Sequence, residues 1–292
     1  MLSNHKDIPQ VNAILLISCV DQKGITATVT DFIYRHNGNI INADQHIDDQ
    51  TSTFFMRLEW SMVDFDLEKE EISQEFLPTA DKYQMKWEIH FTDEPPRVAV
   101  FVSKHLHCLV DLLFRQMSGQ FSCEIPLVIS NHSHARAVAE EFDIEFVEME
   151  ITPENKEEQE KAQVELLKNA DIDFVVLARY HQILTHHFIQ HFRERIINIH
   201  HSFLPAFKGA NPYAQAYAKG VKLIGATSHF VTEELDGGPI IVQETVPVSH
   251  RDTLQDMVRK GEDLEKIALN RALRLALEWK ILRYGNKTVV FE

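Results

Sequence analysis

Three polar side chains stand where apolar segments of the second half of the chain end: Asn198, His200 and Asp236. The apolar run 196–200 predicts a buried strand with a polar tip, and the tips of strands are where open α/β sheets place their chemistry. Asp236 precedes a Gly-Gly-Pro turn at 237–239, so its backbone is constrained and its carboxylate is aimed at one place. An amide, an imidazole and a carboxylate that converge in this way suit acyl transfer.

Strands and helices alternate around these residues. Short apolar runs with helical stretches between them predict an α/β domain, a doubly wound parallel sheet of Rossmann type with right-handed crossovers. An extended pair follows, and then a long helix from Thr253 to Tyr284, which Gly285-Asn286 stops. The predicted strands are Val98–Val102, Ile125–Ile129, Ile144–Val147, Phe174–Ala178, Ile196–Ile199, Leu223–Val231 and Ile240–Thr245.

The N-terminal part of the chain has a different order of elements. A strand, a helix, two strands, a helix and a last strand predict a ferredoxin-like βαββαβ domain. The predicted elements are strand Ala13–Cys19, a helix opened by Gly24 and ended by Asn37-Gly38-Asn39, strands Ile40–His46 and Thr53–Trp60, helix Leu67–Leu77 and strand Tyr83–Phe91. Because Pro95-Pro96 breaks regular structure, we divide the chain into a tail (1–10), a first domain (11–91), a linker (92–96) and a second domain (97–292).

Composition limits the class of protein. The 292 residues are 44% hydrophobic and 25% charged, which is typical of a soluble globular protein with no membrane partner. No signal peptide or membrane-length apolar run is present, so a cytoplasmic location is expected. Three cysteines without CxxC spacing indicate reduced thiols. A formal net charge of −15 disfavours nucleic acid as a partner, because such binding relies on clustered Lys and Arg.

Sixteen histidines raise the question of a metal site. None of them stands at His-Glu-X-X-His spacing, and adjacent residues of a strand point to opposite faces of the sheet. We therefore expect no metal ion and no tightly bound cofactor. Cys108 is expected to be a buried cysteine of a helix rather than a nucleophile.

Three ordered segments carry a resemblance to a known family. They are Asn198-Ile199-His200-His201-Ser202-Phe203-Leu204-Pro205, Gly225-Ala226-Thr227-Ser228-His229-Phe230-Val231 and Leu235-Asp236-Gly237-Gly238-Pro239-Ile240. Together they resemble the signature of enzymes that handle the formyl group of 10-formyltetrahydrofolate. That family includes glycinamide ribonucleotide formyltransferases, methionyl-tRNA formyltransferases and formyltetrahydrofolate deformylases. The negative net charge lowers the weight of the tRNA branch.

The resemblance implies roles for the polar side chains. The formyl group on N10 is an amide, so its transfer needs a nucleophile, stabilisation of an oxyanion and a proton for the departing nitrogen. Asn198 would donate to the oxyanion, and His200, as a cation, would donate to the same oxygen. Asp236 would accept a hydrogen bond from the attacking water or from the imidazole, with His229 beside it. No role is assigned to His201 or Lys208.

The same resemblance implies a folate pocket along a strand end and the following loop. This segment comprises Arg179, Tyr180, His181, Gln182, Ile183 and Leu184. Backbone groups there would bind the edge of the pterin while Ile183 and Leu184 pack on its ring, and Arg179 is an alternative partner for the glutamyl tail. The plainer interpretation is ordinary packing of a strand end.

The loop after the first strand of the second domain decides among the branches. Formyltransferases acting on glycinamide ribonucleotide carry a glycine-rich phosphate loop there, whereas this chain has Ser103-Lys104-His105-Leu106-His107-Cys108-Leu109, without glycine. Lys104, His105 and His107 resemble the deformylase version of this loop, where they support the site. The resemblance therefore implies hydrolysis of 10-formyltetrahydrofolate to formate and tetrahydrofolate, which supplies formate for purine biosynthesis and balances one-carbon pools.

Two alternatives stay open at this point. One is a formyltransferase with an unidentified amine acceptor that fits a loop lacking glycine. The other is a non-catalytic, amino-acid-sensing protein that has kept a folate-binding domain. Intact Asn198, His200 and Asp236 argue against the second.

The first domain resembles an ACT domain, the amino-acid-sensing module. Asp21-Gln22-Lys23-Gly24-Ile25 and Asn37-Gly38-Asn39-Ile40 match its two turn motifs. The resemblance implies an amino-acid effector near Gly24 and Asn39, and a homo-oligomer, dimer or tetramer, paired through these domains. The plainer interpretation is a glycine needed only for its turn and an asparagine that tolerates positive φ.

Overall fold

The computed structural model describes residues 10–207 and 211–292. It divides into two compact units. One runs to Pro95 and also includes 279–282 and 289–292, and the other comprises 96–278 and 283–288. Within the described residues, no helix has the length and apolar character needed to cross a membrane.

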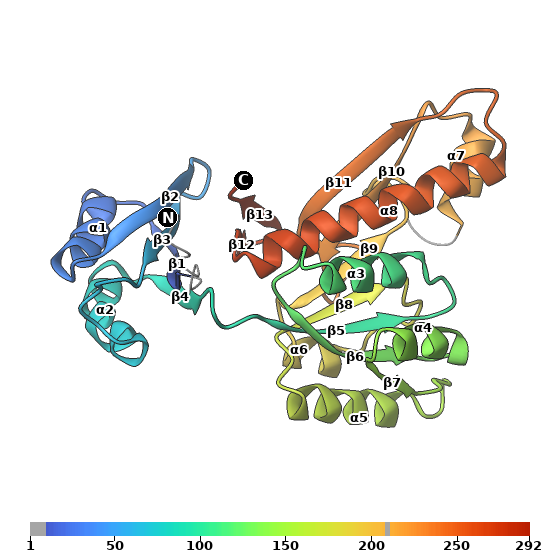
Figure 1. Ribbon diagram of the computed structural model, residues 1–292. Coiled ribbons are helices and arrows are strands. Elements are labelled where there is room, and N and C mark those ends of the chain that lie inside the picture. Colours follow the sequence, from blue (N-terminus) through green and yellow to red (C-terminus); the bar gives the residue numbers. More distant parts are fainter. Residues whose placement is uncertain (1–9, 208–210) are drawn as a thin grey trace, which may run out of the picture. The chain divides into compact units, whose positions relative to one another are not determined.

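The first unit contains an antiparallel sheet in the order β2-β3-β1-β4, as Figure 1 shows in blue and cyan. Its elements are β1 (Asn12–Val20), α1 (Ile25–Arg35), β2 (Asn39–Asp48), β3 (Thr53–Ser61), α2 (Lys69–Tyr83) and β4 (Lys86–Phe91). Leu15 and Ile17 of β1 form the core with Val29 of α1 and Phe76 of α2. This is the predicted βαββαβ fold.

Helix α2 is longer than the sequence interpretation allowed. The predicted helix ends at Leu77 and the next strand starts at Tyr83, whereas α2 continues past Pro78 to Tyr83. The buried residues Ile72, Phe76, Ala80 and Tyr83 follow one another at helical spacing, so the apolar stripe crosses the proline.

The second unit contains a sheet in the order β11-β10-β9-β8-β5-β6-β7. Strands β5 to β9 are parallel, and β10 and β11 extend the sheet in antiparallel fashion. The elements are β5 (Arg97–Val102), α3 (His107–Met117), β6 (Glu124–Ser130), α4 (Arg136–Glu141), β7 (Glu145–Glu148), α5 (Lys156–Asn169), β8 (Phe174–Ala178), α6 (His186–His191), β9 (Ile196–His200), α7 (Pro212–Lys219), β10 (Leu223–Phe230), β11 (Ile240–Pro247) and α8 (Leu254–Leu277).

The order of the strands reverses at β5 and β8. From β5 the chain passes through α3 to β6 on one side, and from β8 it passes through α6 to β9 on the other. Figure 1 shows α3 and α8 on one face of the sheet and α5 and α6 on the opposite face. The crevice beyond the carboxyl ends of β5 and β8 is therefore a topological switch point, where sheets of this type bind ligands.

The C-terminal helix was predicted to run to Tyr284, and this prediction is wrong. Helix α8 ends at Leu277, and Trp279 has a positive φ of +52°. The chain then forms a hairpin of β12 (Ile281–Tyr284) and β13 (Lys287–Val290), so Gly285, with φ +55°, makes a hairpin turn instead of ending a helix. Because of this return, the structure groups 279–282 and 289–292 with the first unit, whereas the sequence division placed all of 97–292 in the second domain.

Candidate active site

The antiparallel pairing of β9 and β10 brings Asn198 opposite His229. His229 is buried, its Nδ1 donates to the carbonyl oxygen of Phe230 at 2.9 Å, and its Nε2 accepts from the Asn198 amide nitrogen at 3.1 Å. Burial lowers the pKa of His229, which keeps the imidazole neutral and able to accept. This hydrogen bond turns the amide nitrogen of Asn198 toward His229 and holds the amide in that orientation.

The carboxylate of Asp236 lies beside both imidazoles. Its Oδ1 is 3.3 Å from Nδ1 of His200 and 4.0 Å from Nε2 of His229. The hydrogen bond from His200 lowers the pKa of Asp236 against the opposing effect of burial, so the group stays ionised. Asp236 therefore accepts from His200, and the Nε2 atom of His200 is buried without a hydrogen-bond partner in the described part of the chain.

The turn that carries Asp236 requires glycine. Asp236 itself has φ +53°, a conformation that aspartate tolerates better than most residues. A Cβ on Gly238 would lie 1.9 Å from the carbonyl oxygen of Phe230, so only glycine lets the turn approach β10 this closely. Phe230 also donates its backbone N–H to Pro239 at 2.9 Å. The Leu-Asp-Gly-Gly-Pro turn therefore packs closely against β10, the strand that carries His229, and so positions the Asp236 carboxylate beside it.

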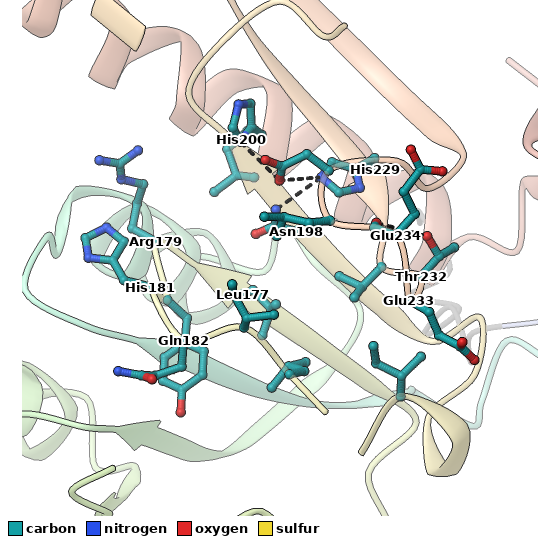
Figure 2. A pocket seen from close by; sticks show the side chains of 18 of the residues that line it. Leu177, Arg179, His181, Gln182, Asn198, His200, His229, Thr232, Glu233 and Glu234 are labelled. Carbon is teal, nitrogen blue, oxygen red and sulfur yellow. Dashed lines mark hydrogen bonds and ion pairs between the residues drawn. The ribbon is translucent and has the colours of Figure 1, made fainter. Parts of the chain in front are cut away.

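A cavity of about 230 Å³ opens beside these groups. One wall is formed by all six residues predicted to bind folate, Arg179, Tyr180, His181, Gln182, Ile183 and Leu184. The other walls are formed by Asn198, His200, His201, His229 and the segment 231–236. Figure 2 shows the side chains of Asn198, His200 and His229 gathered at one end and those of His181 and Gln182 at the other. The two sets of residues therefore line one and the same pocket.

The predicted folate residues differ in their surroundings. Tyr180 is buried and packs edge-on against Phe101, with ring centroids 5.2 Å apart, so it also belongs to the core. Leu184 is buried, whereas Ile183 is 58% exposed and available to a ligand. Arg179 lines the pocket, but its Nε lies 3.5 Å from Oε2 of Glu265.

The loop residues Lys104, His105 and His107 do not line this pocket. His107 donates from Nε2 to Oε2 of Glu265 at 2.8 Å, and the His105 ring lies 5.7 Å from that of His181. Lys104 is exposed. Lys104 and His105 belong to the loop after β5 and His107 is the first residue of α3, at the switch point of the sheet.

Sequence reasoning missed Glu265, which is fully buried on α8. Tyr213 donates to its Oε1 at 2.7 Å, while His107 and Arg179 face its Oε2. Burial alone would raise the pKa of Glu265, but the His107 hydrogen bond, the Arg179 charge and the Tyr213 hydrogen bond lower it. A glutamate on the apolar face of the amphipathic α8 was the signal in the sequence that pointed to a buried charge.

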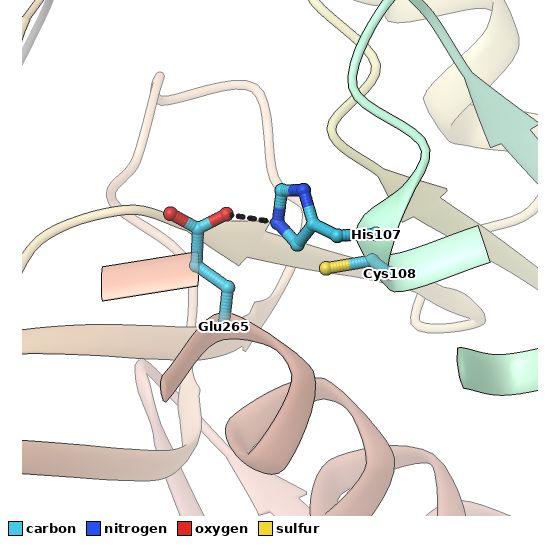
Figure 3. Close-up of side chains that lie close together, drawn as sticks. All are labelled: His107, Cys108 and Glu265. Atoms are coloured by element: carbon cyan, nitrogen blue, oxygen red, sulfur yellow. Dashed lines mark hydrogen bonds and ion pairs between the residues drawn. The ribbon is translucent and has the colours of Figure 1, made fainter. Parts of the chain in front are cut away.

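One ring nitrogen of His107, the sulfur of Cys108 and one carboxylate oxygen of Glu265 lie within 4.8 Å of one another. Figure 3 shows the three side chains close together. Burial raises the pKa of the Cys108 thiol well above its usual value, which makes it a poor metal ligand. Both Glu265 oxygens already have partners, and the nearby Arg179 guanidinium repels a cation. The contacts of His107 and Glu265 are those of an ion-pair network.

Two other predicted positions lie in the first unit. Gly24 precedes α1 with φ +94°, and Asn39 begins β2; both are exposed. The residue of this turn with positive φ is Asn37, at +59°, so the plainer interpretation of Asn39 does not hold. Lys208 lies outside the described residues.

Comparison with known proteins divides the chain in the same way. Residues 96–273 match the formyl transferase family and residues 13–72 match the ACT domain family. A formyltetrahydrofolate deformylase of Synechocystis sp. is 53% identical over 96% of this chain and 99% of its own length. The crystal structure of a formyltetrahydrofolate deformylase from Pseudomonas syringae pv. tomato is similar with a TM-score of 0.96 at 44% identity, covering 98% of this chain and 96% of that one.

A more distant structure is a glycinamide ribonucleotide transformylase from Symbiobacterium toebii. Its TM-score is 0.64 at 30% identity, and the match covers 68% of this chain and 95% of that one. The fold and the site thus define a formyl transferase domain fused to an ACT domain. Within that class the chain belongs to the formyltetrahydrofolate deformylase family. The predicted family and fold class are confirmed.

Proposed function

We propose that the protein hydrolyses 10-formyltetrahydrofolate to formate and tetrahydrofolate. The observation that carries this proposal is the ionised Asp236 bonded to His200 beside the fixed amide of Asn198, all three at one end of the pocket. Membership of the deformylase family supports it. The pocket wall from Tyr180 to Leu184 would hold the pterin, and the exposed Ile183 would pack on its ring.

The reaction follows from these contacts. Water, oriented by the Asp236 carboxylate, attacks the formyl carbon, and the new oxyanion accepts from the Asn198 amide N–H. Nε2 of His200, which has no partner among the described residues, would be the second donor to that oxygen when the imidazole carries both protons, because its Nδ1–H is already bonded to Asp236. The C–N10 bond then breaks, and the proton taken from water passes to N10. The donors needed for the oxyanion are all side chains, so the proposed reaction needs no metal ion.

Release of formate in the absence of an amine acceptor tests the proposal. Purified protein and 10-formyltetrahydrofolate should give formate and tetrahydrofolate in equal amounts, with the same rate after chelation of divalent ions. A reaction that required an added amine would instead make the protein a formyltransferase. A requirement for a divalent ion would contradict the metal-free mechanism.

The first unit would regulate this reaction. An ACT domain match and the exposed Gly24 and Asn39 at neighbouring turn motifs support an amino-acid effector. An effector must bind active and inactive arrangements with different affinity, and folate must change effector affinity in return. The same domains would pair copies of the chain into a dimer or tetramer, which sedimentation measurements test.

Gly24→Ala is the variant that tests the effector site. At φ +94° the added Cβ is strained, and it would lie 3.2 Å from Oη of Tyr83. With deformylation rate as the readout, wild-type protein should respond to one member of an amino-acid panel and Gly24→Ala should not. Asn39→Ala, at an exposed position, checks the result without backbone strain. Wild-type protein that responds to none of the amino acids would contradict regulation by this domain.

A further inference from the structure

The crevice at the switch point between β5 and β8 is filled by a charged network. Glu265 of α8 stands at its centre with an exposed fraction of 0%. His107 at the start of α3, Tyr213 of α7 and Arg179 at the end of β8 all turn toward its carboxylate. Groups from four elements thus meet where sheets of this class receive a ligand.

The residues packed around this network hold the Glu265 carboxylate in place. A Cβ on Gly261, one turn before Glu265 on α8, would lie 2.1 Å from Cζ and Oη of Tyr213. Glycine at this position is what allows the Tyr213 ring to reach the carboxylate. On the next turns, Asn270 of α8 bonds to Asp111 of α3, which holds the two helices together. The carboxylate is therefore fixed in position.

Arg179 connects this network to the pocket. It directly follows β8, has φ +61° and lines the pocket together with His200 and His201. Its Nε lies 3.5 Å from Glu265, and its Nη1 is buried without a hydrogen-bond partner in the described part of the chain. Figure 2 shows the guanidinium at the His200 side of the pocket, pointing away from Gln182. The side chain thus stands between the proposed reacting groups and the crevice.

We propose that Arg179, held by Glu265, is a specificity-determining residue. Its side chain blocks the path from the crevice at the switch point to the formyl carbon for nucleophiles larger than water. The inference rests on the proposed hydrolysis. An amine that approached the formyl carbon through the crevice would have to displace a guanidinium from a buried carboxylate, and a charged ammonium would also be repelled by it. The similar structure from Symbiobacterium toebii is a glycinamide ribonucleotide transformylase, and the ribonucleotide in its name is far larger than water.

Removal of the side chain should change the product. Arg179→Gly opens the crevice and suits the positive φ at this position. With 10-formyltetrahydrofolate and excess hydroxylamine, the amine nitrogen would attack the formyl carbon, the C–N10 bond would break and a proton from the amine would pass to N10. The ratio of formylated hydroxylamine to formate is the measured quantity, and it should rise at least tenfold over wild type.

Two further variants complete the experiment. Arg179→Lys keeps a cation but loses the planar guanidinium, so a smaller rise is expected; it also serves if Arg179→Gly fails to fold. Asp263→Ala removes an exposed carboxylate of the same helix that lies outside the network, and its ratio should equal that of wild type. Wild-type protein that releases no formate without amine would overturn the proposed function. Formate release by wild type, with no rise of the ratio in either folded Arg179 variant, would overturn only this inference.

Discussion

Asp236 and Glu265 are two carboxylates of the second unit, each bonded to a histidine, and they differ in what surrounds them. Asp236 is in the pocket wall and accepts from His200 at 3.3 Å. Glu265 is fully buried, and both of its oxygens have partners, on α3, on α7 and directly after β8. Asp236 therefore faces space in which a substrate can bind, whereas both oxygens of Glu265 are occupied by contacts with other side chains.

This difference predicts that substitution of Asp236 mainly lowers turnover, whereas substitution of Glu265 mainly lowers stability. Loss of the Asp236 charge should affect turnover and leave the fold intact, because few contacts depend on it. Loss of Glu265 should affect stability first, because Arg179, whose side chain is only 12% exposed, would lose its counter-charge. Measurements of turnover and unfolding on both variants separate the two roles.

The largest effect is expected for Asp236→Asn. Asparagine also tolerates the φ of +53°, so the turn is preserved while the charge beside His200 is removed. Turnover should fall roughly 10³- to 10⁴-fold, equivalent to about 4–5.5 kcal/mol of barrier, with folate affinity nearly unchanged. Steady-state kinetics and folate titration measure both quantities. A decrease of less than about tenfold, or ~1.4 kcal/mol, would rule out the role given to this carboxylate.

Glu265→Ala should have the next largest effect, on the free energy of unfolding. Breaking a buried ion pair by removing one partner costs about 3–5 kcal/mol. Asp263→Ala is the matched control on the same helix, because Asp263 is exposed and pairs with Lys266 at 2.8 Å, a surface contact worth roughly 0–1 kcal/mol. Urea unfolding of the three proteins gives the comparison. Equal stability of the two variants would contradict the structural role of Glu265.

A smaller effect on turnover is expected for His229→Phe. The substitution keeps a buried ring but removes the acceptor that orients the Asn198 amide at 3.1 Å. Turnover should fall up to about a hundredfold, or ~2.7 kcal/mol, less than for Asn198→Ala, which removes the oxyanion donor itself. If His229→Phe and Asn198→Ala together were no slower than Asn198→Ala alone, the two residues would act as one unit.

The sequence predicted those features that local pattern determines. The bounds of β8 agree with the prediction at both ends, because Phe174–Ala178 is a short apolar run between polar segments. Asn198 and His229 were both singled out because they lie in motifs, and the register of β9 and β10 explains why they meet. Their catalytic and binding roles, like that of Asp236, stay predictions.

Features that depend on distant contacts could not be predicted. Glu265 and His107 are 158 positions apart, and Tyr213 and Glu265 are 52 apart, so only the folded chain brings them together. The end of α8 was misplaced because Gly285 serves a hairpin turn as well as it would serve a helix end. His107 was assigned to the supporting loop without its partner, since nothing in the spacing of the loop indicates a carboxylate on α8.

The smallest effect concerns His201, whose ring stacks on that of His200 with centroids 5.1 Å apart. Burial and the nearby Arg179 charge lower the pKa of His201 to about 3. Below pH ~6.5 the unfolded chain therefore binds a proton that the folded chain does not, and stability falls as the pH is lowered toward 3. At pH 5.5 this single group should cost about 1.4 kcal/mol relative to neutral pH.

His201→Phe isolates this contribution, because it keeps an aromatic ring against His200 but cannot be protonated. Between pH 7.5 and 5.5 the free energy of unfolding of wild type should decrease by about 1.4 kcal/mol more than that of the variant. Urea unfolding at both pH values measures the difference. Parallel pH profiles for the two proteins would mean that His201 is protonated to the same extent in the folded and unfolded chain, which would contradict the lowering of its pKa by burial and by the Arg179 charge.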